Sequence, residues 1–216
     1  DADKREFALG AEAMRSYGFG PARAYDLETV IRHMRPTILV GTSGMAGTFT
    51  EGALREMARH APGPLVFPMS NPTSKTEAHP ERVLEWTGGT ALVATGSPFE
   101  PVERAGRTHL IGQANNAFVF PGVGLGSMVA EVRQLPDELF LAAAHAVADA
   151  VPDDRVAHGA LYPRQADLRA VSRAVAVRVA TSARDGGYGR ALSDDQIERA
   201  TAGAMWFPAY RRYRPA

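Results

Sequence analysis

The chain has 216 residues, of which 45% are hydrophobic and 22% charged, and this is typical of one globular domain, or of one domain with an appendage, rather than of a disordered segment. The 24 Lys and Arg residues balance the 24 Asp and Glu residues, so net charge gives no reason to expect nucleic acid or an acidic membrane as a partner. The lack of cysteine excludes thiol chemistry and disulfides, and without an apolar run near the ~18 residues that span a bilayer we expect a cytoplasmic protein.

The first predicted element is a helix over residues 27–34, preceded by Asp26 as a suitable N-cap. Its apolar residues have the spacing of one helical face; they are Leu27, Val30, Ile31 and Met34. The next run, 37–40, is apolar without alternation. Such a run predicts a strand that is covered on both faces.

The same pattern then repeats. Thr48 and Glu51 have the spacing of a capping box at the start of a helix, and an apolar strand is expected at 65–67. Pro80 starts the next predicted helix, which a strand at 91–95 follows. Strands that recur about every 27 residues with a helix between them predict right-handed crossovers and a parallel sheet.

Ligands of such sheets bind outside the carboxyl ends of the strands. The loops at those ends are residues 41–47, 70–73 and 96–98, which are rich in Gly, Ser, Thr, Asn and Pro. We interpret these three loops as one candidate site. The alternative is chance, because turns favour the same residue types in any protein.

The pattern changes after residue 101. Residues 107–112 are expected to form an edge strand, and helices are predicted near 136–150, 166–184 and 193–204. The tail from Trp206 to Arg214 is aromatic and basic. Two alternatives are open for this tail: it packs on a neighbouring subunit, or it folds back on its own domain.

Two glycine clusters lack the G-x-G-x-x-G spacing of a pyrophosphate-binding loop. The first, Gly41-x-x-Gly44-x-x-Gly47, follows a strand. The second occupies 122–126 ahead of a predicted helix, and close helix packing explains it better than a ligand. No P-loop, nucleophile elbow or pair of histidines with metal-binding spacing occurs in the sequence.

Three asparagines are the polar groups of most interest: Asn71, Asn115 and Asn116. A carboxamide offers both a donor and an acceptor without a charge. It can therefore hold a carboxylate or a hydroxyl group without changing the charge near a cofactor. Amides of this kind at strand ends suit a small hydroxy acid, although asparagine is also common in turns.

A series of motifs, in the same order along the chain, resembles the malic enzyme family. They cover nearly nine-tenths of the sequence, from about residue 26 to the end. The motifs are residues 41–51 (GTSGMAGTFTE), 68–74 (PMSNPTS), 94–99 (ATGSPF), 112–126 (GQANNAFVFPGVGLG), 161–163 (LYP) and 206–210 (WFPAY).

The resemblance implies an α/β fold with a Rossmann-like parallel sheet and flanking helices, which lacks its first βα unit and ends in C-terminal helices. Residues 1–132 would form a partial NAD-binding domain, and residues 133–216 a helical extension packed on the same domain. It also implies oxidative decarboxylation of L-malate to pyruvate and CO2, with NAD or NADP and with Mg²⁺ or Mn²⁺. The expected assembly is a homo-oligomer, a dimer or tetramer, without nucleic acid or membrane partners.

The resemblance also assigns roles to residues at the predicted loops. Asn71 and Asn115 would contact malate, and Asn116 would lie near the nicotinamide ribose. The residues expected to bind the cofactor are Thr42, Ser43, Gly44, Met69, Ser70, Asn71, Gly96 and Asn116.

The sequence also departs from the family. The catalytic tyrosine and lysine of the family, its acidic metal ligands and its first dinucleotide fingerprint have no counterpart in the chain, and neither Lys4 nor Lys75 matches the lysine. We therefore expect no catalytic or metal-binding residue here, with the metal bound outside this chain. The chain is interpreted as the C-terminal portion of a malic enzyme, inactive alone. The alternatives are a malolactic enzyme, which forms lactate, and a non-catalytic fragment for nucleotide binding or oligomerisation.

Overall fold

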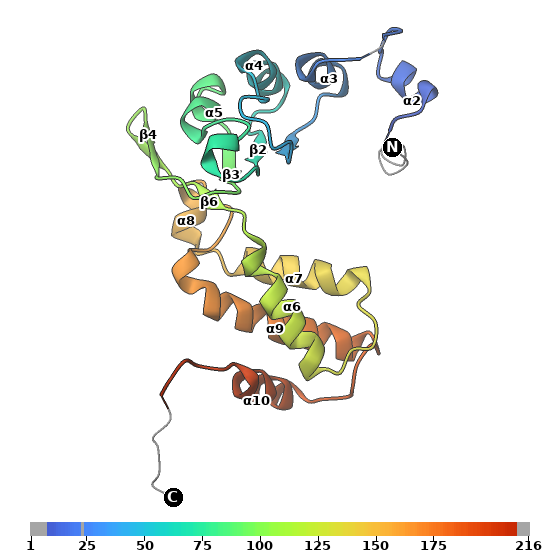
Figure 1. The fold of residues 1–216 in the computed structure, drawn as a ribbon, viewed down its shortest axis with the longest axis vertical. Helices are drawn as coiled ribbons and strands as arrows, with labels where there is room; N and C mark the ends of the chain where they lie inside the picture. The colour runs from blue at the N-terminus through green and yellow to red at the C-terminus, as the bar shows by residue number, and fades with distance from the viewer. Residues whose placement is uncertain (1–7, 23, 211–216) are drawn as a thin grey trace, which may run out of the picture. The chain divides into compact units, whose positions relative to one another are not determined.

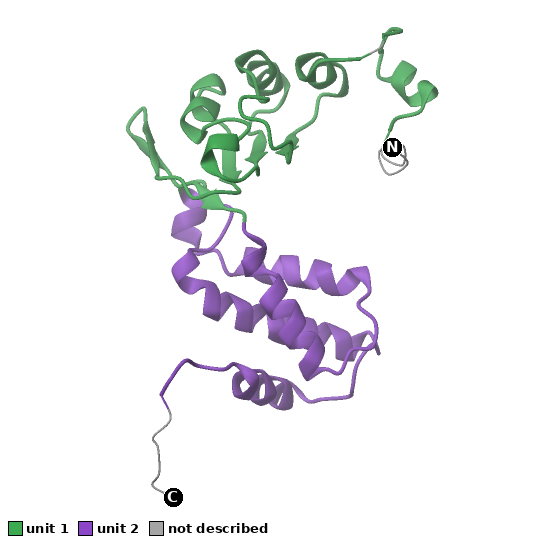
Figure 2. Cartoon of the chain, viewed as in Figure 1, with its two compact units in different colours: residues 1–114, 158–160 green, residues 115–157, 161–216 purple. Residues whose placement is uncertain are grey.

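The computed structural model describes residues 8–22 and 24–210 (Figure 1). Two compact units make up the chain (Figure 2). The sheet unit contains the chain up to residue 114 together with 158–160, and the helical unit contains 115–157 and the chain from 161 onward. These units are defined by packing alone, so the predicted domain division at residue 132 stays a prediction.

The sheet unit is built on four parallel strands in the order β1-β2-β3-β6 (Figure 1). The strands are β1 (Ile38–Gly41), β2 (Leu65–Pro68), β3 (Leu92–Thr95) and β6 (Gly112–Gln113). The helices of this unit are α2 (Ala11–Ser16), α3 (Leu27–Met34), α4 (Glu51–His60), α5 (Pro80–Trp86) and the short 3-10 helix η1 (Thr73–Lys75). The predicted parallel α/β sheet with flanking helices is confirmed.

The apolar faces of α3, α4 and α5 and of strands β2 and β3 meet in one core. The stripe predicted for α3 contributes Ile31, which is fully buried, and Leu27, which packs beside it. The buried members of this core are Ile31, Phe49, Ala53, Leu54, Met57, Val66, Ala78, Val83, Leu84, Ala91 and Val93. Helix α4 lies between α3 and α5 in this core and contacts both.

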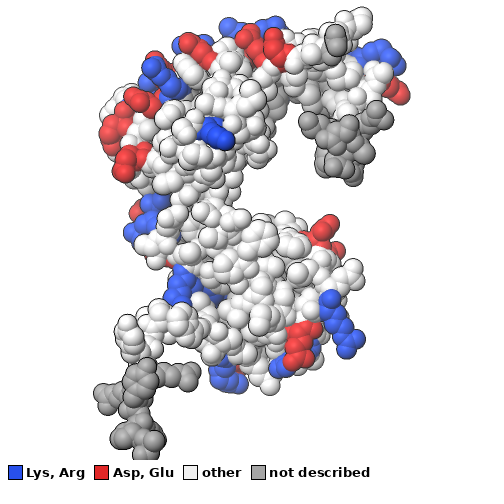
Figure 3. Space-filling view, viewed as in Figure 1, with Lys and Arg blue, Asp and Glu red and all other residues white. Residues whose placement is uncertain are grey.

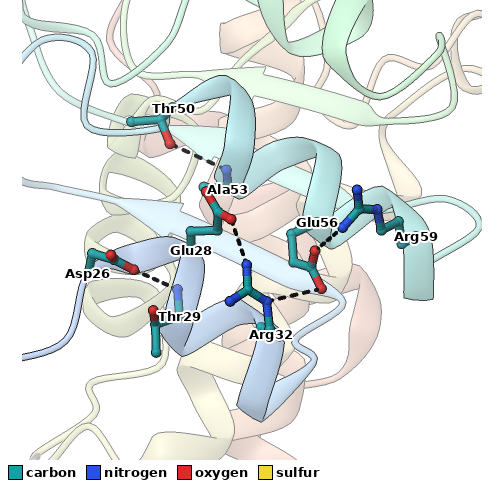
Figure 4. Close-up of polar contacts among 8 residues, drawn as sticks. All are labelled: Asp26, Glu28, Thr29, Arg32, Thr50, Ala53, Glu56 and Arg59. Atoms are coloured by element: carbon teal, nitrogen blue, oxygen red, sulfur yellow. Dashed lines mark hydrogen bonds and ion pairs between the residues drawn. The ribbon is translucent and has the colours of Figure 1, made fainter.

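The starts of α3 and α4 are capped by side chains (Figure 4). The Asp26 carboxylate accepts the N–H of Thr29 at 2.7 Å, which confirms the predicted N-cap. The prediction that Thr48 caps α4 was wrong: Thr50 is the N-cap and accepts the N–H of Ala53 at 3.3 Å, whereas the Thr48 hydroxyl donates to the carbonyl of Met45. The helix therefore begins directly after Thr50.

The α3–α4 contact also carries a small ion-pair network (Figure 4). Arg32 on α3 pairs with Glu28 at 2.6 Å and reaches Glu56 on α4 at 3.9 Å, and Arg59 pairs with Glu56 at 2.5 Å. The arginines are about half exposed or more, so such pairs contribute little to stability individually. Their effect is to orient two helices that the apolar core already joins.

Strand β1 is the edge of the parallel sheet. Within the described part of the chain, no strand pairs with its outer side. Its side chains Ile38 and Val40 are 53% and 59% exposed. The prediction that this run is covered on both faces was therefore wrong for the described residues, because a short apolar run does not itself reveal whether a second layer covers it.

The predicted edge strand at 107–112 is two different strands. Strand β5 (Arg107–His109) pairs antiparallel with β4 (Val102–Arg104), and residues 112–113 belong to β6 of the parallel sheet. The hairpin turns through Ala105 and Gly106, both with positive φ (49° and 74°). A two-residue turn of that geometry matches the twist of paired strands.

The helical unit contains α6 (Phe120–Val129), α7 (Asp137–Asp149), α8 (Asp153–Ala157), α9 (Leu168–Asp185) and α10 (Asp194–Ala204), with 3-10 turns η2 (Asn116–Phe118) and η3 (Gln165–Asp167). Helix α9 packs against α6, α7 and α10. The buried residues of its core include Phe118, Val123, Leu139, Val171, Val175, Val179 and Ile197. The helices predicted near 136–150, 166–184 and 193–204 are confirmed.

The second glycine cluster lies inside α6 and does not precede a helix. A Cβ on Gly122 would lie 2.5 Å from Cβ of Val175, and one on Gly126 would lie 2.5 Å from the carbonyl oxygen of Ala176. Both glycines therefore allow α6 to approach α9 closely. Close helix packing was the predicted role of this cluster, and it is confirmed.

The surface offers few further distinguishing features. Acidic and basic side chains are interspersed on the face drawn in Figure 3. No helix in the described ranges is both long and apolar enough to cross a membrane.

The described part of the tail contacts α9, where the guanidinium of Arg169 lies 5.2 Å from the ring centre of Phe207. Residues 211–214 lie outside the described part, so neither alternative for the tail is decided.

Candidate functional site

The carboxyl edge of the sheet brings together the loops after β1, β2 and β3. Gly41 and Pro68 are register partners at the ends of β1 and β2. The N–H of Gly44 donates to the Ser70 hydroxyl at 2.8 Å, and the N–H of Met69 donates to the carbonyl of Gly41 at 2.9 Å. Residues predicted from three separate loops thus lie at one edge; they are Thr42, Ser43, Gly44, Met69, Ser70, Asn71 and Gly96.

Gly96 is required by the close approach of the loops after β2 and β3. A Cβ at this position would lie 2.0 Å from the carbonyl oxygen of Met69, closer than any side chain allows. The N–H of Gly96 also donates to the carbonyl of Pro68 at 3.2 Å. Gly96 therefore allows the two loops to approach because it has no side chain, and it contributes no reactive group.

The sequence reasoning missed Glu77, which is the centre of this edge. Its side chain is fully buried. The carboxylate oxygen Oε1 accepts the Ser43 N–H at 2.8 Å, the Ser43 hydroxyl at 2.8 Å and the Ser70 hydroxyl at 2.5 Å, and Oε2 accepts the Ser70 N–H at 3.2 Å. The feature of the sequence that could have indicated Glu77 is a glutamate between two small residues, just before the helix that begins at Pro80.

The charge state of Glu77 follows from these contacts. Burial by itself raises the pKa of a carboxyl group, but the hydrogen bonds from Ser70 and Ser43 outweigh it and hold the pKa of Glu77 below its ordinary value of 4.5. The group is therefore ionised at neutral pH. A charged, buried and fully hydrogen-bonded carboxylate ties the loop after β1 to the loop after β2.

The lowered pKa predicts how stability depends on pH. Since the folded pKa of Glu77 lies below the unfolded one, its stabilisation is complete above about pH 4.5 and is lost as pH falls through the folded pKa. At pH 7 we expect Glu77→Gln to lower the free energy of unfolding by about 1–3 kcal/mol. That difference should shrink below pH 4.5.

Urea unfolding at pH 7, 5, 4 and 3, followed by Trp86 fluorescence, measures this prediction. Trp86 lies on α5 in the sheet unit, and a Trp206→Phe background removes the other tryptophan, which is 75% exposed in the tail. Stability curves of wild type and Glu77→Gln that run parallel across this pH range would contradict the assignment.

Three consecutive N–H groups of the loop after β1 are already engaged within the protein and are not free for a phosphate. The N–H of Ser43 goes to Glu77, that of Gly44 to Ser70, and that of Met45 to the Ser43 hydroxyl at 3.1 Å. Gly44 and Gly47 have positive φ (67° and 74°), and a Cβ on either would meet no atom within 4 Å. The loop therefore presents a bare, open backbone surface.

Asn71 lies at the same edge and is exposed. Its Oδ1 accepts the hydroxyl of Ser97, from the loop after β3, at 2.5 Å. The peptide bond between Asn71 and Pro72 is cis. With Oδ1 engaged, the amide Nδ2 is the group that Asn71 can donate to a ligand.

Asn115 and Asn116 open the helical unit. Oδ1 of Asn115 accepts the N–H of Ala117 at 2.9 Å, which caps η2. Because that donor is a backbone N–H, the amide orientation is fixed and Nδ2 remains to donate to a ligand. Asn116 is exposed. Since these residues belong to the other unit, their grouping with Asn71 stays a prediction.

A metal site is not formed by the part of the chain that the structure describes. Within it, no cluster of three or more His, Cys, Asp or Glu side chains is placed to hold an ion. The acidic pairs Asp153–Asp154 and Asp194–Asp195 lie in the first turns of α8 and α10. Acidic residues stabilise helix N-termini, so these pairs have a structural explanation.

A hollow of about 530 Å³ lies on the helical unit, beside α9 and α10. Its two arginines are already paired: Arg173 with Glu198 at 2.7 Å and Arg178 with Asp149 at 2.9 Å. It contains none of the predicted site residues. The carboxyl edge of the sheet is therefore the better candidate, as expected for an open parallel sheet.

A parallel sheet flanked by helices, with its connecting loops gathered at the carboxyl edge, defines the Rossmann-like class of α/β proteins. Comparison with known families shows a match to the description "Malic enzyme, NAD binding domain" over residues 2–184. The chain belongs to the malic enzyme family.

Curated relatives agree with that assignment. The chain is 45% identical to an NAD-dependent malic enzyme of Edwardsiella ictaluri, over 86% of this chain and 33% of the relative, and 45% identical to NAD-dependent malic enzyme 3 of Bacillus subtilis, over 98% and 37%. It thus spans about a third of the length of these relatives.

Solved structures show the same fold. The malic enzyme of Entamoeba histolytica aligns with a TM-score of 0.66 at 20% identity, over 85% of this chain and 34% of that chain. The malic enzyme of Pyrococcus horikoshii aligns with a TM-score of 0.60 at 24% identity, over 80% and 36%. At these identities the alignments establish the fold alone.

Proposed function

We propose that this chain is the C-terminal, cofactor-binding part of an enzyme that oxidatively decarboxylates L-malate to pyruvate and CO2 with NAD or NADP. The observation that carries the proposal is the convergence of three family motifs at one sheet edge, in a chain 45% identical to relatives named NAD-dependent malic enzyme. Those names favour NAD over NADP. A cytoplasmic homo-oligomer, a dimer or tetramer, is part of the same proposal.

The residues present fit a dinucleotide. Gly44 and Gly47 leave open space above the backbone, and Ser70, Asn71 and Gly96 complete the edge. A nicotinamide cofactor bound at this edge would supply the hydride acceptor for oxidation of malate at C2. In this proposal, Nδ2 of Asn71 and of Asn115 donates to malate oxygens and orients the substrate, while Thr42, Ser43, Gly44, Met69 and Asn116 line the cofactor.

The described residues do not fit a divalent metal, so we assign no step to one here. In the proposal, the Mg²⁺ or Mn²⁺ ligands and the catalytic residues belong to sequence outside this chain. The uncovered edge of β1, with Ile38 and Val40 exposed, supports an additional βα layer in the complete protein. The chain covers 33% and 37% of the two curated relatives named above and 34% and 36% of the two solved structures.

The experiment is a comparison of the isolated chain with the full-length protein. With malate, NAD and Mn²⁺, the full-length protein should release NADH and pyruvate, and the 216 residues alone should show no turnover. NADH release also separates a malic enzyme from a malolactic one, which forms lactate without releasing NADH. Malate turnover by the isolated chain would refute the fragment assignment, and a full-length protein without turnover would favour a non-catalytic role.

A further inference from the structure

Four groups of described residues donate to the Glu77 carboxylate, and they come from Ser43 and Ser70. Both serines are proposed cofactor-binding residues. Glu77 itself is fully buried behind them, so it does not line the open surface. It is therefore placed to act on the ligand edge through other residues.

The carboxylate fixes the direction of each hydrogen bond. An ionised carboxylate only accepts, so the hydroxyls of Ser43 and Ser70 both donate to it. The Ser70 oxygen then has lone pairs free to accept, and it receives the N–H of Gly44 at 2.8 Å. A directed chain, Gly44 N–H to Ser70 Oγ–H to Glu77, thus runs from the exposed backbone of one loop to the buried charge.

The surrounding backbone is built for this carboxylate. A Cβ on Gly41 would lie 2.7 Å from the carboxyl carbon of Glu77, so Gly41 provides its space. The main-chain carbonyl of Glu77 accepts the N–H of Phe49 at 3.1 Å. Glu77 therefore holds the loop after β1 both near its start and at its end.

We propose that Glu77 is a positioning residue for the nicotinamide cofactor. The buried negative charge of Glu77 holds the Gly41–Gly44 backbone and Ser70 in the arrangement that receives the dinucleotide. This inference rests on the proposed function, because it takes the sheet edge as the cofactor site. It adds that Glu77 contacts neither malate nor the dinucleotide and yet sets the affinity for the dinucleotide.

The test uses the full-length protein with Glu77→Gln, which keeps the side-chain length but replaces one acceptor oxygen with a donor N–H2 that opposes the serine donors. The matched control is Glu81→Gln, an exposed glutamate on α5 four residues away. Fluorescence titration measures the Kd for NADH, and amide hydrogen exchange is followed in residues 41–47 and 68–74. Steady-state kinetics gives KM and kcat separately for NAD and malate.

In Glu77→Gln we expect the Kd for NADH and the KM for NAD to rise about tenfold or more, because a charged hydrogen bond is lost. The amide hydrogens of Ser43 and Gly44 should exchange faster by a similar factor. The kcat at saturating NAD should change less than about threefold, because Glu77 does not touch the reacting atoms. Ser70→Ala should act on the same readouts, and the double variant should be less than additive. Glu81→Gln should match wild type.

A Glu77→Gln protein with wild-type NADH affinity would overturn the inference, and so would a lowered melting temperature with unchanged affinity, which defines a purely structural glutamate. If Glu77→Gln does not fold, Ser70→Ala decides, since it removes one hydroxyl only: an unchanged Kd in that variant also overturns the inference. A wild-type protein that binds NADH keeps the proposed function in place in all of these cases. Wild-type protein without NADH binding would refute the proposed function, and this inference with it.

Discussion

Replacing Asn115 with Asp in the full-length enzyme is expected to raise the KM for malate about 100-fold, a loss of about 2.7 kcal/mol. The substitution keeps an oxygen that accepts the N–H of Ala117, the bond of 2.9 Å that caps η2. The cap is therefore preserved, since aspartate caps helices as well as asparagine does. The other end of the group changes from a donor N–H2 to a negatively charged oxygen, which would repel the dicarboxylate in the proposed substrate site.

The same reasoning applies to Asn71, whose Oδ1 accepts the Ser97 hydroxyl. Asn71→Ala and Asn115→Ala should each weaken malate use by about 1–3 kcal/mol, because the substrate loses a hydrogen-bond partner. Gln134→Glu, an exposed amide after α6, adds the same charge away from the site and serves as the control. Steady-state kinetics with malate varied at saturating NAD measures all four variants.

Thermal melts complete this comparison. The melting temperature of Asn115→Asp should stay close to that of wild type. A large fall in melting temperature with unchanged malate kinetics would make these asparagines structural turn residues. A wild-type KM for malate in Asn115→Asp and in Asn71→Ala would remove the two residues from the substrate site.

Gly126→Ala is expected to destabilise the helical unit by about 1–3 kcal/mol, the usual cost of overpacking a close contact. The added methyl group would lie 2.5 Å from the carbonyl oxygen of Ala176 and 2.9 Å from Cβ of Val179. The first of these atoms is backbone, so α6 and α9 must separate for the methyl group to fit.

Gly124→Ala is the matched control for this substitution. It lies on the same helix two residues away, and its Cβ would meet no atom within 4 Å. Alanine there should raise stability by up to about 1 kcal/mol, since glycine is a poor helix former. Urea unfolding followed by circular dichroism at 222 nm measures both variants, and shifts of the same sign would contradict the packing role of Gly126.

Much of the sheet unit could be predicted from the sequence because local pattern and tertiary structure agree there. The stripe of α3 and the apolar runs of β2 and β3 coincide with the structure, and crossover geometry then requires their carboxyl-end loops to share one edge. The candidate residues of these loops, from Thr42 to Gly96, follow from that rule and from the family resemblance together.

The features that were not predicted from the sequence have physical reasons. Helix α6 begins with a glycine-rich run of low helix propensity, and its packing on α9 outweighs that local preference. The β4–β5 turn uses Ala105 with positive φ, which is uncommon for a residue with a side chain. Glu77 was missed because burial of a carboxylate depends on donors that lie 34 and 7 residues away in the sequence, and no local pattern reports them.

The uncovered side of β1 has a practical consequence for anyone who expresses this chain by itself. Among the residues that the structure describes, no strand pairs with the outer side of β1, and its β-branched side chains Ile38 and Val40 are exposed. An edge strand of this kind is a template for addition of another strand. At the concentrations used for crystallisation or spectroscopy, copies of the isolated chain should pair edge to edge and precipitate. A lysine at position 38 or 40 would discourage that association and keep the purified sample monodisperse.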